Sequence, residues 1–473
     1  MTVLTFATFG LLAATVSANL KALKIGTTPG GYTKPARGWG SWGIQSGGYL
    51  SSDDFNQQHI QPQCDAMAST LRGLYTVCAL DSGWSFDGGD ENGVIRYNSD
   101  KFDIPNFANH LHRQGQQLGV YVVPGAFTSD YDKYVAGTKT KIRDICDGDY
   151  SFGRCYLKYD HPDTQKWFDS NAKQFAAWGV DYIKLDFLTP GSPSPGTNLR
   201  PDSAGEVIGW HKAIAKSGRK IFLDISWKLD RSKPYFDVWE QNSDAMRVDV
   251  DLNTYSSTPF TSWDRIQKTI EQYRQWAVAA LSYYDVTHTH PDLDDMMVGN
   301  AQNITGLTDE QRRTVFLHWI GASALLKLGS DLTKLDSYGI SLLTNTHALS
   351  AADFTAQYAM QPRNPGSGRS DPQQLQSWIS GPSPSGEIIV LLTNYGKDQG
   401  SGGWGGGHDS TQTVTVSWRD LGVSGPFICR DVLSQQVVVS LLGLKASLTA
   451  GASNMYRCTR LLPGHHFASR YRV

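Results

Sequence analysis

The sequence predicts an α/β protein in which a (β/α)8 TIM barrel is followed by a C-terminal antiparallel β domain. Strand-like and helix-like segments alternate from residue 19 to residue 361, and about eight such units are typical of a closed parallel barrel. A proline- and glycine-rich run at 362–368 then indicates a linker. Short apolar or alternating runs separated by glycine-rich turns follow it. We therefore expect a barrel over 19–361 and a β domain over 362–473.

The expected barrel elements follow from local pattern and punctuation. Short apolar runs between turn residues predict strands at 38–42, 75–81, 119–123, 180–187, 220–226 and 245–252, with a strand-and-loop region at 285–297. Helical spacing predicts helices at 62–71, 106–117, 164–178, 204–217, 262–281 and 309–328. Pro62 would lie in the first turn of its helix, where no backbone N–H is needed. Gly179 would end the helix at 164–178.

The expected C-terminal domain consists of strands alone. Apolar or alternating runs predict them at 387–392, 411–418, 437–442 and 447–449. The glycine-rich segment at 400–408 is not expected to bind phosphate, because a strand and not a helix follows it.

Composition limits the classes of partner. The chain has 473 residues, 40% of them apolar, which is enough to bury a large core. A net charge of -2 gives no basis for binding nucleic acid or an anionic membrane. The 14 Trp and 21 Tyr offer flat faces that can stack on sugar rings, although large cores use them too. The oligomeric state stays open.

The first 18 residues indicate secretion. Met1–Ala18 is apolar and ends in the small residues Ser17 and Ala18, as in a signal peptide, although the usual positive charge near the start is missing. A buried first strand is the alternative. No later stretch approaches the roughly 20 apolar residues of a membrane-spanning helix. We therefore expect a soluble, secreted, extracellular glycoprotein, with a glycosylation sequon at Asn303.

Six cysteines fit an extracellular protein, because an even number in a secreted chain suggests disulfides. Sequence alone leaves 15 possible pairings open. Proximity along the chain favours three of them, which we take as a hypothesis: Cys64 with Cys78, Cys146 with Cys155, and Cys429 with Cys458. No CxxC spacing is present, which argues against a zinc cluster.

The segment Val180–Phe187 reads as a strand that ends in charge. Alternation places Tyr182, Lys184 and Asp186 on one face, and the apolar Ile183, Leu185 and Phe187 on the other. Unpaired buried charges are costly, so this strand indicates either a structural salt bridge or a polar cavity at its end.

Other predicted strands end in charge as well. Asp81 stands at the end of one predicted strand, and alternation places Asp224 and Ser226 on one face of another. Arg247, Asp249 and Asp251 share a face of the strand after that. Asp292, Asp294 and Asp295 lie near the seventh strand. In a barrel, catalytic groups lie at the C-terminal ends of the strands. Crowded carboxylates raise one another's pKa, while Lys184 and Arg247 can hold selected ones ionised. Retaining glycoside cleavage needs one ionised carboxylate and one protonated carboxylic acid, and such a difference in pKa would supply both.

Five motifs in this order resemble the α-galactosidase (melibiase) family of retaining glycoside hydrolases. They are Gly38-Trp39-Gly40-Ser41-Trp42, Leu80-Asp81-Ser82-Gly83-Trp84, Tyr182-Ile183-Lys184-Leu185-Asp186, Met246-Arg247-Val248-Asp249-Val250-Asp251 and Asp295-Met296-Met297-Val298-Gly299-Asn300. Segments at 307–332 and 413–421 also look like the last barrel helix and a C-terminal strand of that family. The resemblance therefore covers nearly all of the chain after residue 18.

The resemblance implies roles for single residues. Asp186 matches the family's nucleophile and Asp251 its general acid/base, in a double displacement that needs no metal or other cofactor. The positions that hold the sugar in the family fall on Trp42, Asp81, Tyr121, Lys184, Arg247 and Asp295, and Ser226 stands at the strand-five position that reads sugar hydroxyls. Lys184 would also keep Asp186 ionised.

Three departures from the family pattern affect specificity. Ser82 replaces a second acidic residue, Ile225 replaces a cysteine in a Cys-polar-Trp motif, and Leu188 replaces a cysteine. Such neighbours distinguish sugar hydroxyls, so the identity of the sugar is open.

The leading hypothesis is a secreted α-galactosidase that acts on a carbohydrate substrate. The alternatives are the same chemistry on an α-glucan, as in isomaltodextranase, or on a β-L-arabinopyranoside, and a catalytically silent carbohydrate-binding protein. His288, His290 and Asp292 could suggest a metal site, but no further ligand cluster accompanies them, and polar lining of the cleft is the preferred interpretation.

Overall fold

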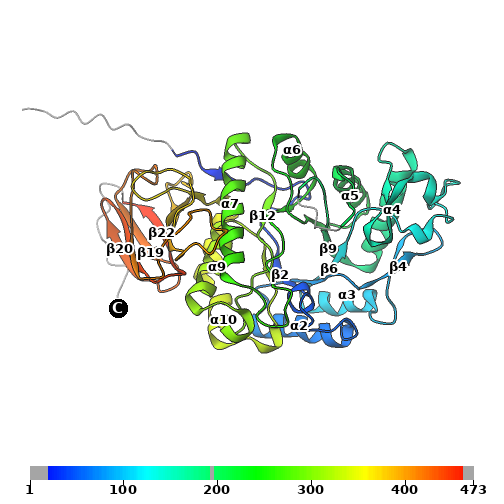
Figure 1. The fold of residues 1–473 in the computed structure, drawn as a ribbon, viewed down its shortest axis with the longest axis horizontal. Helices are drawn as coiled ribbons and strands as arrows, with labels where there is room; N and C mark the ends of the chain where they lie inside the picture. The colour runs from blue at the N-terminus through cyan, green and yellow to red at the C-terminus, as the bar shows by residue number, and fades with distance from the viewer. Residues whose placement is uncertain (1–19, 192–196, 462–473) are drawn as a thin grey trace, which may run out of the picture.

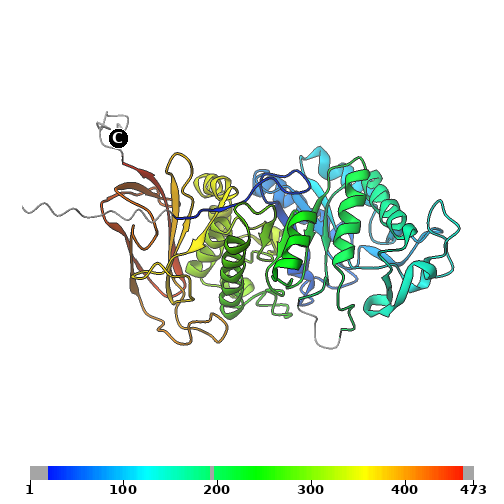
Figure 2. The same cartoon turned by 90° about the horizontal axis from the view of Figure 1, so that it is seen from above.

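The computed structural model describes residues 20–191 and 197–461. A parallel barrel with its helices occupies most of the length of the molecule, and an antiparallel β region lies beside it at one end (Figures 1 and 2). The predicted signal peptide, Met1–Ala18, lies outside the described residues. Among the described residues, no helix is both long enough and apolar enough to cross a membrane.

Eight parallel strands form the central sheet, in the order β12-β11-β10-β9-β6-β3-β2-β13. Their bounds are β2 Arg37–Gly40, β3 Val77–Leu80, β6 Gln117–Val122, β9 Val180–Leu185, β10 Phe222–Ile225, β11 Ala245–Arg247, β12 His290–Asp292 and β13 Leu326–Leu328. A parallel bridge between Met296, just after β12, and Leu328 of β13 joins the two ends of this order. The curled sheet confirms the predicted barrel class.

Helices follow most of the barrel strands (Figure 1). They are α1 Trp42–Gln45, α2 Gln57–Thr70, α3 Ile104–Arg113, α4 Pro162–Trp178, α5 Ala204–Lys216, α6 Lys233–Asn242, α7 Trp263–Tyr283, α8 Gln302–Thr305, α9 Asp309–Gly321, α10 Ser337–Leu343 and α11 Thr346–Thr355. Short antiparallel pairs decorate the barrel: β1 Leu23–Lys24 with β14 Tyr358–Ala359, β4 Ser85–Gly89 with β5 Ile95–Tyr97, and β7 Cys146–Tyr150 with β8 Arg154–Leu157.

The predicted helix at 309–328 is wrong in its second half. Helix α9 ends at Gly321, and Leu326–Leu328 forms β13, the strand beside β2. Nearly all side chains from Thr314 to Leu328 are buried, so no polar face marks where the helix stops. Ser323, with φ of 58°, turns the chain between the two elements.

The predicted position of Pro62 is also wrong. Helix α2 starts at Gln57, because the side chain of Asn56 accepts a hydrogen bond from the backbone N–H of His59 and caps it. Pro62 therefore lies inside the helix. Helix α3 starts at Ile104, two residues earlier than predicted, and ends at Arg113. Gln117, which was predicted as the last residue of this helix, begins β6.

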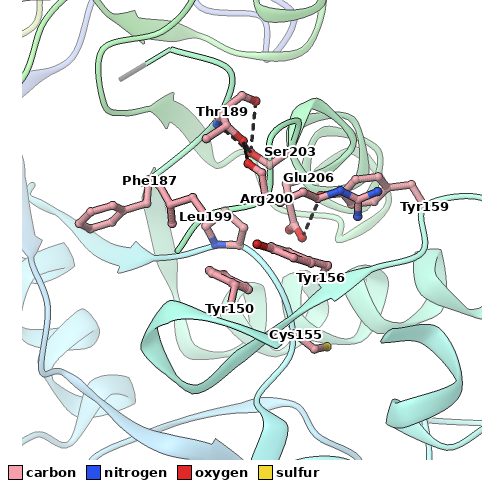
Figure 3. A pocket seen from close by; sticks show the side chains of 11 residues that line it. Tyr150, Cys155, Tyr156, Tyr159, Phe187, Thr189, Leu199, Arg200, Ser203 and Glu206 are labelled. Carbon is pink, nitrogen blue, oxygen red and sulfur yellow. Dashed lines mark hydrogen bonds between the residues drawn. The ribbon is translucent and has the colours of Figure 1, made fainter. Parts of the chain in front are cut away.

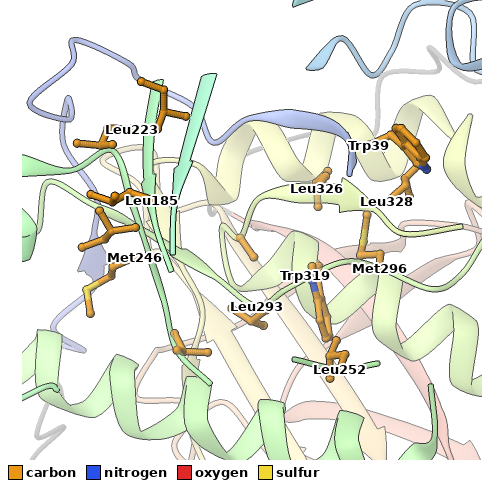
Figure 4. Close-up of a cluster of buried hydrophobic side chains, with 14 of the residues drawn as sticks. Trp39, Leu185, Leu223, Met246, Leu252, Leu293, Met296, Trp319, Leu326 and Leu328 are labelled. Carbon is orange, nitrogen blue, oxygen red and sulfur yellow. The ribbon is translucent and has the colours of Figure 1, made fainter. Parts of the chain in front are cut away.

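Apolar packing divides the barrel into an outer layer and an inner cluster. Leu185, Leu223 and Met246, from the neighbouring strands β9, β10 and β11, belong to the large core and lie together in Figure 4. A separate buried cluster contains Val77, Ala79, Tyr182, Phe222, Ala245 and Leu325. This inner cluster draws residues from β3, β9, β10 and β11 and from Leu325, which directly precedes β13.

The C-terminal region is antiparallel, as predicted. Its six-stranded sheet has the order β15-β16-β17-β22-β19-β20, with β15 Gln361–Pro362, β16 Leu375–Ser380, β17 Ile388–Asn394, β22 Ala452–Arg460, β19 Phe427–Asp431 and β20 Val437–Ser440. A further pair joins β18 Gln412–Ser417 to β21 Gly443–Leu448. The sequence reading missed β16, β19 and β22. The division of the chain between residues 361 and 362 stays a prediction.

The three predicted disulfides are confirmed. They join Cys64 to Cys78, Cys146 to Cys155, and Cys429 to Cys458. The first links α2 to β3, the second links β7 to β8, and the third links the paired strands β19 and β22. Each bond therefore ties together two adjacent elements.

Candidate active site

A cavity of about 880 Å³ lies beyond the carboxyl ends of the barrel strands. Five of the predicted site residues line it: Trp42, Asp81, Tyr121, Asp186 and Asp251. Asp81 directly follows β3 and Asp186 directly follows β9, so parallel strands bring these two carboxylates to the same end of the barrel. The cavity is thus where the fold predicts catalytic chemistry.

The lysine of β9 lies between two of these carboxylates. Lys184 Nζ is 2.8 Å from Asp81 Oδ2 and 3.6 Å from Asp186 Oδ2. The backbone N–H of Phe187 donates to Asp186 Oδ1 at 2.8 Å. All three charged side chains are buried, so the lysine offsets the desolvation of both carboxylates.

Arg247, at the end of β11, holds the second candidate catalytic carboxylate. Arg247 Nη2 is 2.5 Å from Asp251 Oδ1. Two further donors reach Asp251 Oδ2: Trp42 Nε1 at 2.9 Å and the hydroxyl of Tyr255 at 2.8 Å. Asp251 therefore accepts three hydrogen bonds, all of which favour its ionised form.

The remaining contacts of Arg247 fix its position. Its Nη1 donates to Ser226 Oγ at 3.1 Å, and its Nη2 lies 2.9 Å from Asp294 Oδ2. Asp294 Oδ2 also accepts the backbone N–H of Leu252 at 2.7 Å. Ser226 therefore lies behind Arg247. None of Ser226, Arg247 and Lys184 lines the cavity.

Asp295 lies apart from the cavity. It is only 2% exposed, and its Oδ1 is 3.5 Å from Lys327 Nζ. Lys327 also lies 3.7 Å from Asp224 and 3.9 Å from Asp292, so one lysine serves three buried carboxylates. The predicted contact of Asp295 with a sugar has no support from the cavity wall, and Asp294 is the acidic residue that contacts Arg247.

The two candidate catalytic carboxyls differ in pKa. Burial acts to raise the pKa of Asp251, but the charges of Arg247 and Lys184 and the Tyr255 hydrogen bond outweigh burial and lower this pKa to about 2. Burial raises the pKa of Asp186, and the nearby anion of Asp251 adds to that increase despite Lys184. Lys184 acts against burial and lowers the pKa of Asp186, and the ionised state of Asp186 stays a prediction.

Two predicted side-chain directions are wrong. Strand β11 ends at Arg247, so alternation does not continue to Asp249, which lies 3.7 Å from Lys268 of α7 and not beside Asp251. Strand β9 ends at Leu185, and the left-handed backbone of Phe187, with φ of 54°, turns its ring into the cavity wall. Both errors have the same cause, because the strand period was extended past the end of the strand.

The two histidines and Asp292 face different neighbours. His288 is exposed and its Nδ1 lies 3.0 Å from Thr27 O, whereas the buried His290 has its Nδ1 3.1 Å from Ser323 Oγ. Neither histidine lines the cavity, so the prediction that these residues form a polar lining of the cleft is wrong. Within 20–191 and 197–461, no group of three His, Cys, Asp or Glu side chains could hold a metal ion.

Several residues of the cavity wall were not singled out from the sequence. Among them are Tyr255 and three aromatic residues, Phe152, Phe187 and Trp227. Tyr255 and Phe152 lie outside regular strands and helices α1–α11, where no periodicity exists to reveal them. Trp227 had one available signal, because it directly follows the strand-end residue Ser226.

Comparison with known protein families agrees with the motifs. A family model described as Alpha galactosidase A matches residues 133–353. The chain is 39% identical to Alpha-galactosidase 3 of Hypocrea jecorina over 456 residues, which cover 93% of this chain and 73% of that protein. It is 40% identical to a putative alpha-galactosidase 8 of Emericella nidulans over 408 residues, which cover 82% of this chain and 80% of that protein.

Solved structures share the fold at lower sequence identity. A β-L-arabinopyranosidase of Geobacillus stearothermophilus superposes with a TM-score of 0.74 at 19% identity, covering 91% of this chain and 97% of that chain. Alpha-galactosidase I of Mortierella vinacea gives a TM-score of 0.64 at 18% identity, covering 90% of this chain and 97% of that chain. At these identities the likeness concerns the fold and leaves the substrate open.

Proposed function

The chain belongs to the α-galactosidase (melibiase) family of glycoside hydrolases, and from that membership we propose that it hydrolyses terminal α-galactosides with retention of configuration. The observation that carries the proposal is the pair Asp186 and Asp251, which both line the cavity and each have a cation beside them. Retaining cleavage uses two such carboxyl groups at about 5 to 5.5 Å.

In the proposed mechanism, Asp186 attacks the anomeric carbon while Asp251 gives a proton to the leaving oxygen. Asp251 then removes a proton from the water that hydrolyses the glycosyl-enzyme. Asp81, Tyr121 and Trp42 line the cavity and supply partners for the sugar. Lys184 and Arg247 hold the carboxylates from behind, and Ser226 accepts a hydrogen bond from Arg247.

The charges of Arg247 and Lys184 and the hydroxyl of Tyr255 favour the ionised form of Asp251, whereas the role of general acid needs its protonated form. In the proposed mechanism, the bound sugar therefore takes the place of one of these donors. Tyr255 is the donor best placed to move, since 49% of this residue is exposed and its hydroxyl lies on the cavity side of Asp251. A sugar that displaced this hydroxyl would raise the pKa of Asp251 toward that of a general acid.

A panel of chromogenic glycosides tests the substrate. The proposal expects hydrolysis of the α-galactoside well above that of the β-L-arabinopyranoside and the α-glucoside. Ser82 is the reason to include the other sugars, because it lines the cavity next to Asp81 where the family usually has an acidic residue. Proton NMR of the first product should show the α-anomer, whereas an initial β-anomer would mean inversion and would reject the double displacement.

We also propose that the protein is secreted and glycosylated. Three disulfides favour an oxidising compartment. Asn303 of the sequon is exposed and lies in α8. Expression of the full chain in a eukaryotic secretory host, followed by N-terminal sequencing and glycosidase treatment, tests both points: a mature protein starting near residue 19 that loses mass on deglycosylation is expected.

A further inference from the structure

Three aromatic rings in the lining of the cavity contact one another in a row. The ring centroids of Phe187 and Trp227 are 4.9 Å apart at 18°, and those of Phe152 and Phe187 are 4.6 Å apart at 52°. All three residues line the cavity. We call Phe152, Phe187 and Trp227 the aromatic ladder.

The ladder is built by neighbouring segments of the barrel end. Leu185 of β9 and Ile225 of β10 are paired in register, and Phe187 and Trp227 each come two residues later. The two strands therefore present their rings at the same height. Phe152 comes from the 3-10 turn Ser151–Gly153 between β7 and β8.

The ladder runs from the interior to the rim. Trp227 is 7% exposed, Phe187 is half-buried and Phe152 is 46% exposed. In Figure 3 the ring of Phe187 points away from the buried group around Tyr150 and Glu206, so it does not fill that neighbouring pocket. The exposed ring of Phe152 therefore offers an apolar surface at the rim of the cavity.

Backbone strain is concentrated in the same residues. All three ladder residues have positive φ: 68° for Phe152, 54° for Phe187 and 82° for Trp227. With Tyr255, they are four of the eight non-glycine residues with positive φ among the described residues, and all four line this cavity. Such conformations cost about 1 to 3 kcal/mol each and are kept where function needs them. The left-handed turns fix the direction in which these segments present their side chains to the cavity.

The ladder begins at the reacting centre. The backbone N–H of Phe187 binds Asp186 Oδ1, so the turn that orients this carboxylate also sets the direction of the ring. Asp251, Trp42 and Asp81 also line the cavity, and their polar groups suit the hydroxyls of the sugar that is cleaved. The ladder carries no charge and suits the C–H face of a pyranose ring.

We propose that the aromatic ladder binds the first sugar ring of the leaving group, which makes the enzyme favour α-galactosyl oligosaccharides over galactosides with small leaving groups. This inference rests on the proposed function, because it assigns a binding site to the leaving group of the bond that Asp186 and Asp251 would cleave. The ligand is a neutral pyranose that stacks on the exposed ring of Phe152 at the rim, while Phe187, which lies between Phe152 and Trp227, supports that ring.

The test compares two donors that differ only in the leaving group: melibiose, an α-galactosyl disaccharide, and α-galactosyl fluoride, which has no ring to stack. Phe152→Gly and Phe187→Gly should each lower the ratio of kcat/KM for melibiose to kcat/KM for the fluoride by about threefold to tenfold, as expected for one lost stacking contact. Glycine accepts positive φ, so both variants keep the backbone that places Asp186.

Arg72→Gly is the matched control, because Arg72 also has positive φ, 54°, but lies outside the cavity wall. It should leave the ratio unchanged and report any effect of the glycine on thermal stability. The proposal is overturned if the ratio stays constant in both ladder variants, which includes the case in which kcat/KM falls equally for the fluoride and for melibiose. If the wild type hydrolyses neither donor, the proposed function fails separately, and the same ratio is measured with the glycosyl fluoride and disaccharide of the sugar that the panel identifies.

Discussion

Two clusters of buried charge lie in the same barrel and differ in what they face. The cavity cluster contains Asp81, Lys184, Asp186, Arg247 and Asp251. The Lys327 cluster contains Asp224, Asp292, Asp295 and Lys327. Three carboxylates of the cavity cluster line the cavity, whereas no member of the Lys327 cluster does.

Pairing is also different in the two clusters. In the cavity cluster, Lys184 lies 2.8 Å from Asp81 and Arg247 lies 2.5 Å from Asp251, while Asp186 stands 3.6 Å from Lys184. In the Lys327 cluster one lysine stands 3.5 to 3.9 Å from three carboxylates. Burial raises the pKa of Asp224 to about 7 and the pKa of Asp295 well above its usual range. Buried charge by itself therefore does not identify a reaction site; the identification needs access to a cavity as well.

Asp186→Ala should have the largest effect, and only on activity. We expect turnover to fall by about 10⁴-fold or more, because the proposed nucleophile is lost. The midpoint of thermal unfolding should stay within about 2 °C of the wild type, since Lys184 keeps Asp81 at 2.8 Å as its partner. Azide should restore part of the activity by forming the β-galactosyl azide. Normal turnover of the variant would exclude Asp186 as the nucleophile.

Lys327→Met should act on stability. It leaves three buried carboxylates without their cation, which costs on the order of 3 to 5 kcal/mol in the free energy of unfolding measured with urea. Lys334→Met is the matched control, because Lys334 is an exposed lysine 3.4 Å from Asp331, and surface pairs contribute less than about 1 kcal/mol. Equal losses in the two variants would show that the Lys327 cluster is not a structural unit.

Asp224→Asn should change how stability depends on pH. A folded-state pKa of about 7, above the ordinary value of 3.8, means that the folded protein keeps a proton that the unfolded chain loses. The wild type should therefore lose stability as pH rises from about 4 to 7, by on the order of 4 kcal/mol at most from this group. Asp224→Asn should flatten that slope in urea titrations at several pH values. An unchanged slope would contradict a protonated Asp224.

Tyr255→Phe, which removes a donor to the cavity cluster, should have the smallest effect of these variants. Loss of the hydroxyl that donates to Asp251 at 2.8 Å should raise the pKa of this carboxyl by about one unit. The basic limb of the pH profile of kcat/KM should move up by a similar amount if Asp251 is the general acid. Tyr134→Phe, an exposed tyrosine outside the cavity wall, is the control. A basic limb that stays in place would argue against this role of Asp251.

Local patterns were enough to predict one part of the site. Lys184 and Asp186 belong to a strand with clear punctuation, so alternation and the Gly179 stop place them correctly at the end of β9. Asp81 was predictable for the same reason. The parallel order of strands then brings them to one end of the barrel.

The rest depended on information that a periodic pattern does not carry. Asp251 lies four residues beyond the last residue of β11, and only the family motif distinguished it from Asp249. The eighth strand, β13, was missed because an almost completely buried segment has no polar face to mark the end of a helix. Phe187 was assigned to the core face, because left-handed φ at an aromatic residue is not encoded in alternation.

The central claim is that Asp186 is the nucleophile of the cavity cluster, although burial raises the pKa of this carboxyl. A fluorinated α-galactosyl fluoride that slows hydrolysis of the glycosyl-enzyme would let the intermediate accumulate, and mass spectrometry of the digested protein would locate the sugar. The account predicts a labelled peptide with the sugar on Asp186. A label on Asp251 would contradict it.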